Sequence, residues 1–183
     1  MGKRIIETSK FLSFVLRHQP QAIGIALDRE GWTDIDALLA AAARDGRRLD
    51  RALLDEVVRT NDKGRFAISA DGLRIRAVQG HSSATVQLTH RALAPPPLLY
   101  HGTATRFVAA IMRQGLRPGA RHHVHLSQER ATAAGVGARY GMPVVLEVDA
   151  AAMAADGFVF FLAENGVWLT AGVPARYLSR GAA

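Results

Sequence analysis

The sequence predicts an α+β protein built from two lobes. Three helical segments followed by a short hairpin occupy the N-terminal half, whereas strands alternate with short helices in the C-terminal half. Between the halves, the small polar segment 79–84 and the triple proline 95–97 indicate a linker. A chain of 183 residues is long enough for two small domains, which we place at residues 1–94 and 95–183.

The first predicted helix has one apolar face and ends before Pro20. Phe11, Leu12, Val15 and Leu16 recur at helical spacing, so they fall on the same side of a helix. Proline cannot continue a helix and therefore limits its C-terminal end.

Two further helices are predicted from residues that can cap them. Thr33, with Asp36 three residues later, resembles a capping box that opens a helix over 34–43. Asp50 can cap a third helix. The apolar residues of that helix are Leu53, Leu54, Val57 and Val58.

A hairpin completes the first lobe, with strands at 65–68 and 73–78 joined by the turn 69–72. Three helices followed by a two-stranded wing indicate a winged-helix module. In the second strand, Arg74 and Arg76 share one face. That face is either a solvated surface or a basic wing that follows a phosphate backbone.

The second lobe is predicted to be α+β without a regular βαβ repeat. Its expected elements are strands at 98–101, 123–127, 144–148, 158–162 and 167–169, and helices at 105–115 and 129–138. No glycine-rich GxGxxG turn follows a strand, and no Walker loop is present. Neither of the two standard nucleotide folds is therefore indicated.

Composition favours a polyanionic partner inside a reducing compartment. The formal net charge is +7, and both lobes are basic, with 15 Lys and Arg against 11 Asp and Glu in 1–97 and 8 against 5 in 98–183. The absence of cysteine excludes disulfides and thiolate metal sites and fits the cytoplasm. No apolar run approaches the roughly 18 residues of a membrane span, and no signal peptide is expected.

A cluster of histidines in the second lobe lacks the partners of metal or hydrolytic chemistry. Four of the seven histidines fall within 100–127, and no Asp or Glu lies between Arg91 and Glu129. His123 and His125 have a metal-ligand spacing, but the third ligand would have to be His101, so we expect no metal. Side chains of His, Arg, Ser and Thr are instead suited to holding anions.

Each short motif has a structural and a functional interpretation when it is taken alone. The pair Arg17–His18 either complements a helix C-terminus or clamps a phosphate. The segment His101–Gly102–Thr103 is either a plain turn between strand and helix or a place where a ligand lies against the backbone. Arg65 is either a surface arginine or part of a site, and Arg139 is a candidate pyrophosphate contact.

Taken in order, these motifs resemble the RNA 2′-phosphotransferases of the KptA type, which are homologous to the tRNA-splicing phosphotransferase. The resemblance covers nearly the whole chain, and the ordered set is far more specific than any one piece. The matching segments are 9–18, Gly31–Trp32, Arg65–Phe66, 100–103, 121–127, 141–146 and 165–170.

The resemblance implies a winged-helix RNA-binding lobe followed by an ADP-ribosyltransferase-like NAD-binding lobe. It also implies a transferase that uses NAD as a co-substrate and no metal. An internal RNA 2′-monophosphate attacks C1″ of the nicotinamide ribose, and nicotinamide leaves. The ribose O2″ then attacks phosphorus, which gives 2′-hydroxyl RNA and ADP-ribose 1″,2″-cyclic phosphate.

The resemblance also implies two sets of site residues. The catalytic set is Arg17, His18, Arg65 and Arg121. The NAD-binding set is His101, Gly102, Thr103, Ser127 and Arg139. Because the catalytic set is divided between the lobes, both lobes are expected to act on the 2′-phosphate. Glu164 lies in the late segment where many related transferases carry a catalytic glutamate, but we assign it no role.

The expected partner is an RNA that bears an internal 2′-phosphate, such as a tRNA, and the expected protein is a cytoplasmic monomer. One alternative is an ADP-ribosyltransferase that caps a terminal nucleic-acid phosphate and leaves ADP-ribose attached. Another is a winged-helix DNA regulator with an NAD-sensing lobe. The third helix has only Arg51 and Arg59 as cations, which argues against reading of the major groove.

Overall fold

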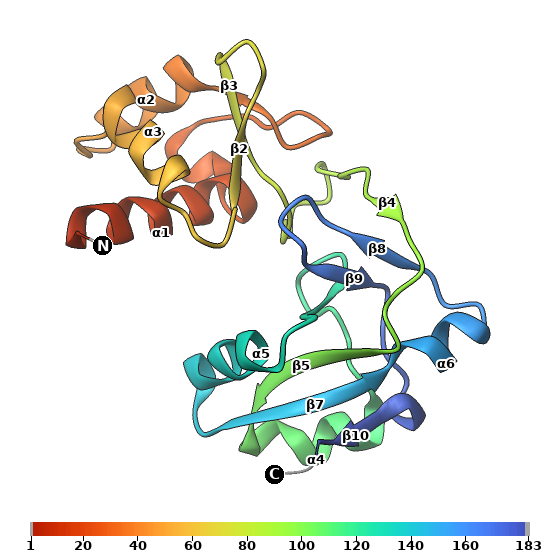
Figure 1. Ribbon diagram of the computed structural model, residues 1–183. Coiled ribbons are helices and arrows are strands. Elements are labelled where there is room, and N and C mark those ends of the chain that lie inside the picture. Colours follow the sequence, from red (N-terminus) through yellow and green to blue (C-terminus); the bar gives the residue numbers. More distant parts are fainter. Residues whose placement is uncertain (1, 182–183) are drawn as a thin grey trace. The chain divides into compact units, whose positions relative to one another are not determined.

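The computed structural model describes residues 2–181 and combines helices with antiparallel sheets, so the predicted α+β class is confirmed (Figure 1). The chain divides into two compact units, the first unit (Met1–Thr89) and the second unit (His90–Ala183). The expected domain limit between residues 94 and 95 stays a prediction. Among the residues that the structure describes, no helix is both long and apolar enough to cross a membrane.

The first unit packs its helices around a small sheet, drawn from red to yellow in Figure 1. In chain order, its elements are α1 (Lys3–Arg17), a 3₁₀ helix (Pro20–Ile23), β1 (Thr33–Asp34), α2 (Ile35–Arg44), α3 (Arg51–Arg59), β2 (Phe66–Ile68) and β3 (Arg74–Ala77). β3 lies in the middle of the sheet and pairs with β1 and β2. The predicted hairpin therefore gains a third strand from the residues that precede α2.

The cap of α2 differs from the prediction, and the cap of α3 agrees with it. Asp34 is the N-cap of α2, and its carboxylate accepts a hydrogen bond from Ala37 N at 2.8 Å. The capping box expected from Thr33 is wrong, because Thr33 is buried in β1 and pairs with Ile75. Asp50 caps α3 as expected.

The core of the first unit contains the apolar face that the sequence predicted for the first helix. Leu12, Leu16, Leu38, Leu54 and Ile75 are fully buried and come from all three helices and from β3. Burial of one such side chain contributes about 1.5–3 kcal/mol. The packing of this core fixes the direction of α1 and the position of its C-terminal end.

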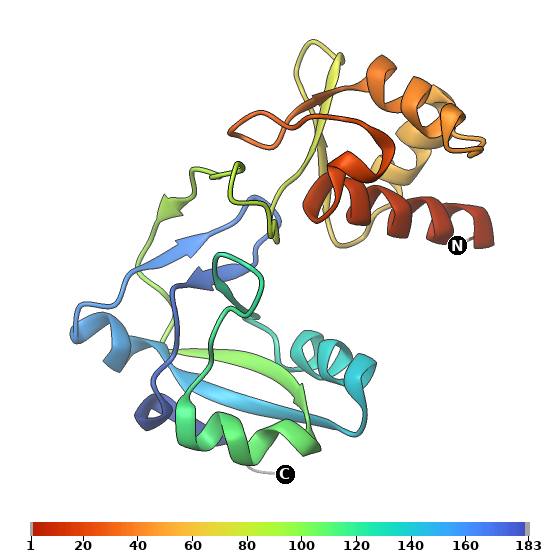
Figure 2. The same ribbon diagram turned by 180° about the vertical axis from the view of Figure 1, so that it is seen from behind.

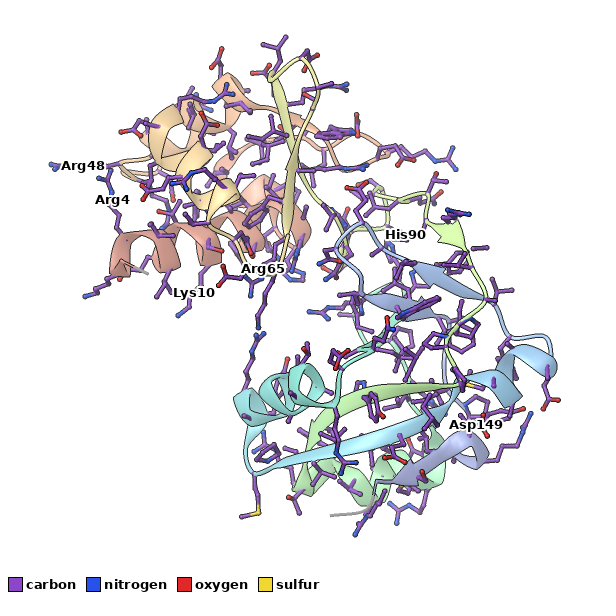
Figure 3. All side chains as sticks on the ribbon, viewed as in Figure 1. Arg4, Lys10, Arg48, Arg65, His90 and Asp149 are labelled. Carbon is purple, nitrogen blue, oxygen red and sulfur yellow. The ribbon has the colours of Figure 1, made fainter. Side chains whose placement is uncertain are left out.

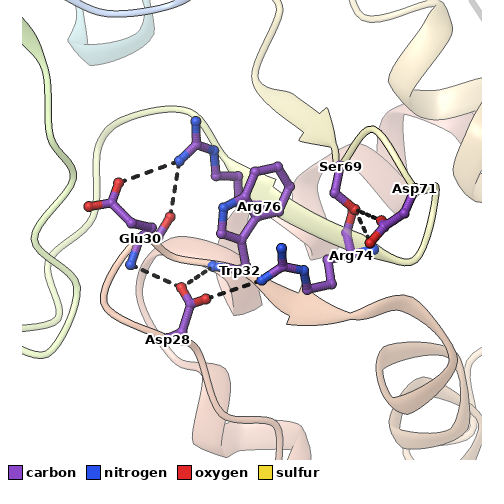
Figure 4. Close-up of polar contacts among 7 residues, drawn as sticks. All are labelled: Asp28, Glu30, Trp32, Ser69, Asp71, Arg74 and Arg76. Carbon is purple, nitrogen blue, oxygen red and sulfur yellow. Dashed lines mark hydrogen bonds and ion pairs between the residues drawn. The ribbon is translucent and has the colours of Figure 1, made fainter.

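A turn before β1 is held against β3 by two arginines (Figure 4). Within the turn, the carboxylate of Asp28 accepts hydrogen bonds from Glu30 N and Trp32 N, both at 2.9 Å. Arg74 lies 3.7 Å from Asp28, and Arg76 lies 3.7 Å from Glu30. The guanidinium carbon of Arg76 lies 4.5 Å from the centre of the Trp32 ring. The wing arginines therefore fasten this turn, and nearby carboxylates balance their charge.

The second unit contains two antiparallel sheets with short helices. In chain order, its elements are β4 (Arg91–Ala92), β5 (Leu98–Ala104), α4 (Thr105–Gln114), β6 (Val124–Leu126), α5 (Arg130–Gly137), a 3₁₀ helix (Ala138–Tyr140), β7 (Pro143–Asp149), α6 (Ala150–Ala155), β8 (Phe160–Leu162), β9 (Trp168–Thr170), a 3₁₀ helix (Ala175–Tyr177) and β10 (Leu178–Arg180). The strand orders are β10-β7-β5 and β4-β8-β9-β6. Figure 2 shows the long pair β5 and β7 from behind.

The sequence predicted most of these elements but missed β4, α6 and β10. β4 has two residues and no apolar pattern of its own, and it pairs with β8. α6 is a run of alanine and methionine capped by Asp149, whose carboxylate accepts a hydrogen bond from Ala152 N. β10 forms only as the third strand beside β7. β4 and β10 therefore depend on strands that are distant in the sequence, and the first two amides of α6 donate to the distant Pro97 carbonyl.

Candidate active site

Arg17 and His18 stand at the C-terminal end of α1, where backbone carbonyls would otherwise lack partners. Arg17 is buried, with 7% of its surface exposed. Ser82 contacts both residues: its backbone N–H donates to the Arg17 carbonyl at 3.0 Å, and its hydroxyl lies 3.0 Å from His18 Nδ1. The pair is therefore held in place by a residue that lies 64 positions after His18.

The segment that holds this pair belongs to the region expected to be a linker. Gly80 has a φ of 86°, and a Cβ atom there would lie 3.7 Å from the Arg17 guanidinium. His81 is buried with 3% exposure, and a Cβ atom on Gly31 would be 3.0 Å from its Nε2. Gln87 continues this packing, since its backbone N–H donates to the Arg29 carbonyl. The stretch before residue 89 is therefore a folded part of the first unit.

Arg65 precedes β2 in the first unit (Figure 3). Its guanidinium donates from Nη1 to the side-chain oxygen of Asn61 at 3.1 Å, and its carbonyl accepts a hydrogen bond from Val78 N at 3.0 Å. Asn61 follows the C-terminal end of α3, and it also accepts a hydrogen bond from Lys63 N at 3.2 Å. A turn after α3 thus helps to orient Arg65.

His101 is a largely buried imidazole in the middle of β5, where it pairs with Leu146. Its Nδ1 lies 3.2 Å from the His125 carbonyl. Because a carbonyl can only accept, Nδ1 carries the hydrogen and Nε2 keeps a free lone pair in the neutral ring. Burial lowers the pKa of His101, and the hydrogen bond to His125 opposes that shift only in part. The environment of His101 therefore favours the neutral ring.

Gly102 lets α5 approach β5 very closely. A Cβ atom on Gly102 would lie 1.7 Å from the Ala133 carbonyl oxygen and 2.9 Å from Gly137 N. The sequence suggested that glycine here lets a ligand reach the backbone, but in this structure the helix occupies that space. The next residue, Thr103, is also buried, with 5% exposure.

Ser127 lies beside the same strand. Its backbone exchanges two hydrogen bonds with Tyr100, both at 2.8 Å, although the two residues are far apart in the sequence. The structure therefore brings Ser127 to the strand that carries His101, Gly102 and Thr103. These four members of the expected NAD-binding set share one region of the second unit.

Arg121 and Arg139 are exposed cations in turns of the second unit. Arg121 precedes β6, and its backbone N–H donates to the Pro118 carbonyl at 3.3 Å. Arg139 lies in the 3₁₀ helix after α5. Neither guanidinium forms a hydrogen bond or ion pair with another residue between 2 and 181. Both groups are open to solvent, as a contact to a mobile anion requires.

His90, His123 and His125 contact aromatic rings or backbone of this unit. The His123 ring contacts His90 and Phe161 edge-on, at centroid distances of 6.1 and 5.6 Å. Burial first, and then the neighbouring His122, lowers the pKa of His123. His125 Nδ1 lies 3.0 Å from the His123 carbonyl. In residues 2–181 there is no group of three or more His, Asp or Glu that could hold a metal ion.

Sequence reasoning missed Asn61 and Ser82, which contact Arg65 and His18. Neither residue stands out along the chain, because one sits in a polar turn and the other in a run of small polar residues. Their importance comes from contacts that form only after folding. The nearest signal is Gly80, which allows the backbone to turn two residues before Ser82.

The chain belongs to the RNA 2′-phosphotransferase, Tpt1/KptA family, because residues 3–172 match the model of that family. All nine candidate residues fall within this range. A protein of Pseudomonas aeruginosa named "Probable RNA 2′-phosphotransferase" is 64% identical over 176 residues, which cover 96% of this chain and 97% of that protein.

Two further relatives carry the same name. The one from Burkholderia lata is 62% identical over 170 residues, covering 93% of this chain and 88% of its own. The one from Escherichia coli is 59% identical over 176 residues, covering 96% and 91%. The similarity therefore extends over both units.

Proposed function

We propose that the protein removes an internal 2′-monophosphate from RNA, with NAD as the acceptor of the phosphate. In the first step, a 2′-phosphate oxygen bonds to C1″ of the nicotinamide ribose, and the bond to nicotinamide breaks. In the second step, O2″ attacks phosphorus, and the RNA 2′-oxygen leaves. The products are 2′-hydroxyl RNA, ADP-ribose 1″,2″-cyclic phosphate and nicotinamide.

The observation that carries this proposal is the family match over residues 3–172, which includes the complete set Arg17, His18, Arg65 and Arg121. These side chains are suited to a dianionic phosphate, because guanidinium groups bind such anions with paired hydrogen bonds. The phosphate itself is ionised at pH 7, since its second pKa is about 6, so the first step needs no general base.

The environment of His101 is consistent with a role beside NAD. A nicotinamide ring attached to ribose is cationic, and a protonated histidine next to it would repel it. Burial favours the neutral form of His101, and the contact of Nδ1 with the His125 carbonyl leaves Nε2 as the nitrogen that would accept a hydrogen bond from a ligand. We place His101, Thr103 and Ser127 in the NAD-binding set, with Gly102 shaping the strand and Arg139 contacting the pyrophosphate.

The guanidinium groups would act mainly in the second step. Negative charge concentrates on the phosphorus oxygens as O2″ attacks, and preorganised cations stabilise that charge. We assign this role to Arg65 and Arg121, with Arg17 holding the phosphate. His18 would either donate a hydrogen bond to the phosphate or assist deprotonation of O2″.

At the level of fold, we propose that the first unit is a winged-helix RNA-binding lobe and the second an ADP-ribosyltransferase-like lobe. The helices of the first unit with β2 and β3 support the former. The antiparallel β5–β7 pair next to a second sheet supports the latter. We further propose a monomeric protein of the cytoplasm that acts on RNA such as tRNA.

The test is to incubate the protein with NAD and a short RNA that carries one internal 2′-phosphate, without added metal, and to identify the products by mass. Release of 2′-hydroxyl RNA together with ADP-ribose cyclic phosphate is the expected result. RNA that retains ADP-ribose at an internal 2′-phosphate would show a blocked second step. Transfer only to a terminal phosphate would favour the capping activity, and unchanged NAD would refute the proposal.

A further inference from the structure

Ser82 contacts both members of the Arg17–His18 pair, and it does so with two different groups. Its backbone N–H donates to the Arg17 carbonyl, and its hydroxyl lies 3.0 Å from His18 Nδ1. The first contact belongs to the backbone and survives any substitution except proline. The second belongs to the side chain alone, so the two contributions can be separated by mutation.

We propose that Ser82 is a positioning residue that acts through His18 and keeps a hydrogen on its Nε2. The inference rests on the proposed function only in taking His18 as a group that faces the RNA 2′-phosphate. Ser82 itself touches neither substrate nor NAD in this proposal. Its hydroxyl sets which ring nitrogen of His18 is the donor.

The hydroxyl can serve His18 in both protonation states. When the ring is neutral, the Ser82 hydroxyl donates to Nδ1, which leaves the hydrogen on Nε2. When the ring is protonated, Nδ1–H donates to the Ser82 oxygen, and Nε2 still carries its hydrogen. The 3.0 Å distance between the Ser82 hydroxyl and His18 Nδ1 suits a hydrogen bond in either direction, and in this proposal the hydroxyl donates whenever the ring is neutral.

This arrangement selects between the two roles open to His18. A ring whose Nε2 always carries a hydrogen donates to a phosphate anion, and it has no free lone pair there to remove a proton from O2″. A carboxylate at position 82 would act differently, because it would favour the protonated ring and raise its pKa. The uncharged serine hydroxyl can therefore set the orientation and tautomer of the His18 ring through one hydrogen bond.

The backbone around Ser82 is held independently of its hydroxyl. Gly80 makes the turn in the left-handed region, and His81 is buried next to Gly31. The following Val86 is fully buried as well. Removal of one hydroxyl should therefore leave the segment folded, and Ser82→Ala is an informative variant.

The experiment combines a structural and a kinetic measurement on the full chain. Nitrogen NMR gives the tautomer of the His18 ring, with its signals assigned by comparison with His18→Gln. Single-turnover rates are measured with NAD and the internally 2′-phosphorylated RNA. The variants are Ser82→Ala, Ser82→Thr, which keeps the hydroxyl, and the control Ser83→Ala, whose hydroxyl instead bonds Thr85 at 2.7 Å.

We expect neutral His18 in the unchanged protein to carry its hydrogen on Nε2, and Ser82→Ala to mix the two tautomers. The rate should fall about tenfold in Ser82→Ala, as expected for one lost hydrogen bond, with KM for NAD unchanged. Ser82→Thr should restore both readouts, and Ser83→Ala should alter neither.

An unchanged tautomer in Ser82→Ala would overturn the proposal, whatever the rate, because Ser82 would then not act through His18. A changed tautomer with an unchanged rate would overturn it too, since the orientation would not matter for the reaction. If the unchanged protein does not use this RNA, the proposed function fails. The tautomer measurement still decides whether Ser82 directs His18.

Discussion

Arg65 is oriented by Asn61 and belongs to the catalytic set that we propose. If Arg65 stabilises charge in the second step, Arg65→Ala should lower the single-turnover rate on the order of 100-fold at saturating RNA. RNA affinity, measured by anisotropy, should change by less than about threefold, because many other contacts to phosphates contribute to binding.

Arg74→Ala is the matched control, because it also removes one positive charge from the first unit. Arg74 is already engaged with Asp28 and Trp32, so its loss should leave the single-turnover rate within about twofold. Loss of RNA affinity in Arg65→Ala, together with a normal rate at saturation, would show that Arg65 binds RNA and does not act in the chemical step.

The lowered pKa of His101 predicts a pH-dependent stability. In the unfolded chain the ring titrates near its ordinary pKa of about 6.5, whereas in the folded protein it takes up a proton only at lower pH. The contribution of His101 to stability is therefore complete above about pH 6.5. It is lost as the pH falls from there through the folded pKa.

Urea unfolding at pH 7.5 and 5.5 can isolate this contribution. His101→Asn keeps a donor for the His125 carbonyl but cannot be protonated, so the variant should lose less stability on acidification than the unchanged protein. Equal losses in the two proteins would mean that His101 is readily protonated in the folded state.

At the scale of elements, the close contact between β5 and α5 depends on the absence of a side chain at Gly102. Gly102→Ala would place a methyl group 1.7 Å from the Ala133 carbonyl oxygen, so strand and helix must separate. Such overpacking should cost about 3 kcal/mol or more in the free energy of unfolding, measured by urea denaturation.

Gly135 provides a control inside α5, because a Cβ atom there meets nothing within 4 Å. Gly135→Ala should stabilise the protein by about 0.5–1 kcal/mol, through the better helix propensity of alanine. A tolerated Gly102→Ala would mean that α5 can shift away from β5 easily. In that case glycine at this position would be explained by ligand access, as the sequence first suggested.

Local sequence patterns predicted the elements whose own residues show a recognisable spacing or residue type. The apolar face of α1, the cap at Asp50, the β2–β3 hairpin and the strand β7 could all be found from spacing and residue type. The strand β10 could not, because it exists only beside β7. Asp34, and not Thr33, caps α2, because Thr33 belongs to β1 and pairs with Ile75 of β3.

The sequence also predicted only part of the candidate site. Resemblance to the family suggested the candidate side chains, such as Arg17 and His18. It could not identify what orients them, because the contact from Ser82 joins residues 64 positions apart. It also offered ligand access as the reason for glycine at position 102, and the structure adds a second reason, the close approach of α5.

At the scale of the whole molecule, little free chain connects the two units. Gln87 and Thr89 are hydrogen bonded within the first unit, to Arg29 and Glu30. Arg91 already pairs with Leu162 in the second unit. The carbonyl of Pro97, after the proline run, accepts two backbone hydrogen bonds within the second unit. The connection is therefore confined to a few residues around position 90.

Insertion of four Gly and Ser residues after Thr89 should lower kcat/KM at least tenfold if both units must hold one phosphate, since positioning would become less favourable. Thermal stability should change little. The same insertion after Gly46, at an exposed turn with open space around it, should leave kcat/KM unchanged. An active protein with the longer connection would mean that contacts between the units, and not the connecting chain, fix the geometry.

The chain contains two tryptophans, and they are distributed one to each unit. Trp32 lies beside the guanidinium groups of Arg74 and Arg76, whereas Trp168 is enclosed in the apolar core of the second unit with 5% exposure. Each unit therefore contains its own intrinsic fluorophore, in a distinct surrounding. A single-tryptophan version of the protein would report on one unit alone, so that the order in which the two halves melt becomes visible by emission without any attached dye.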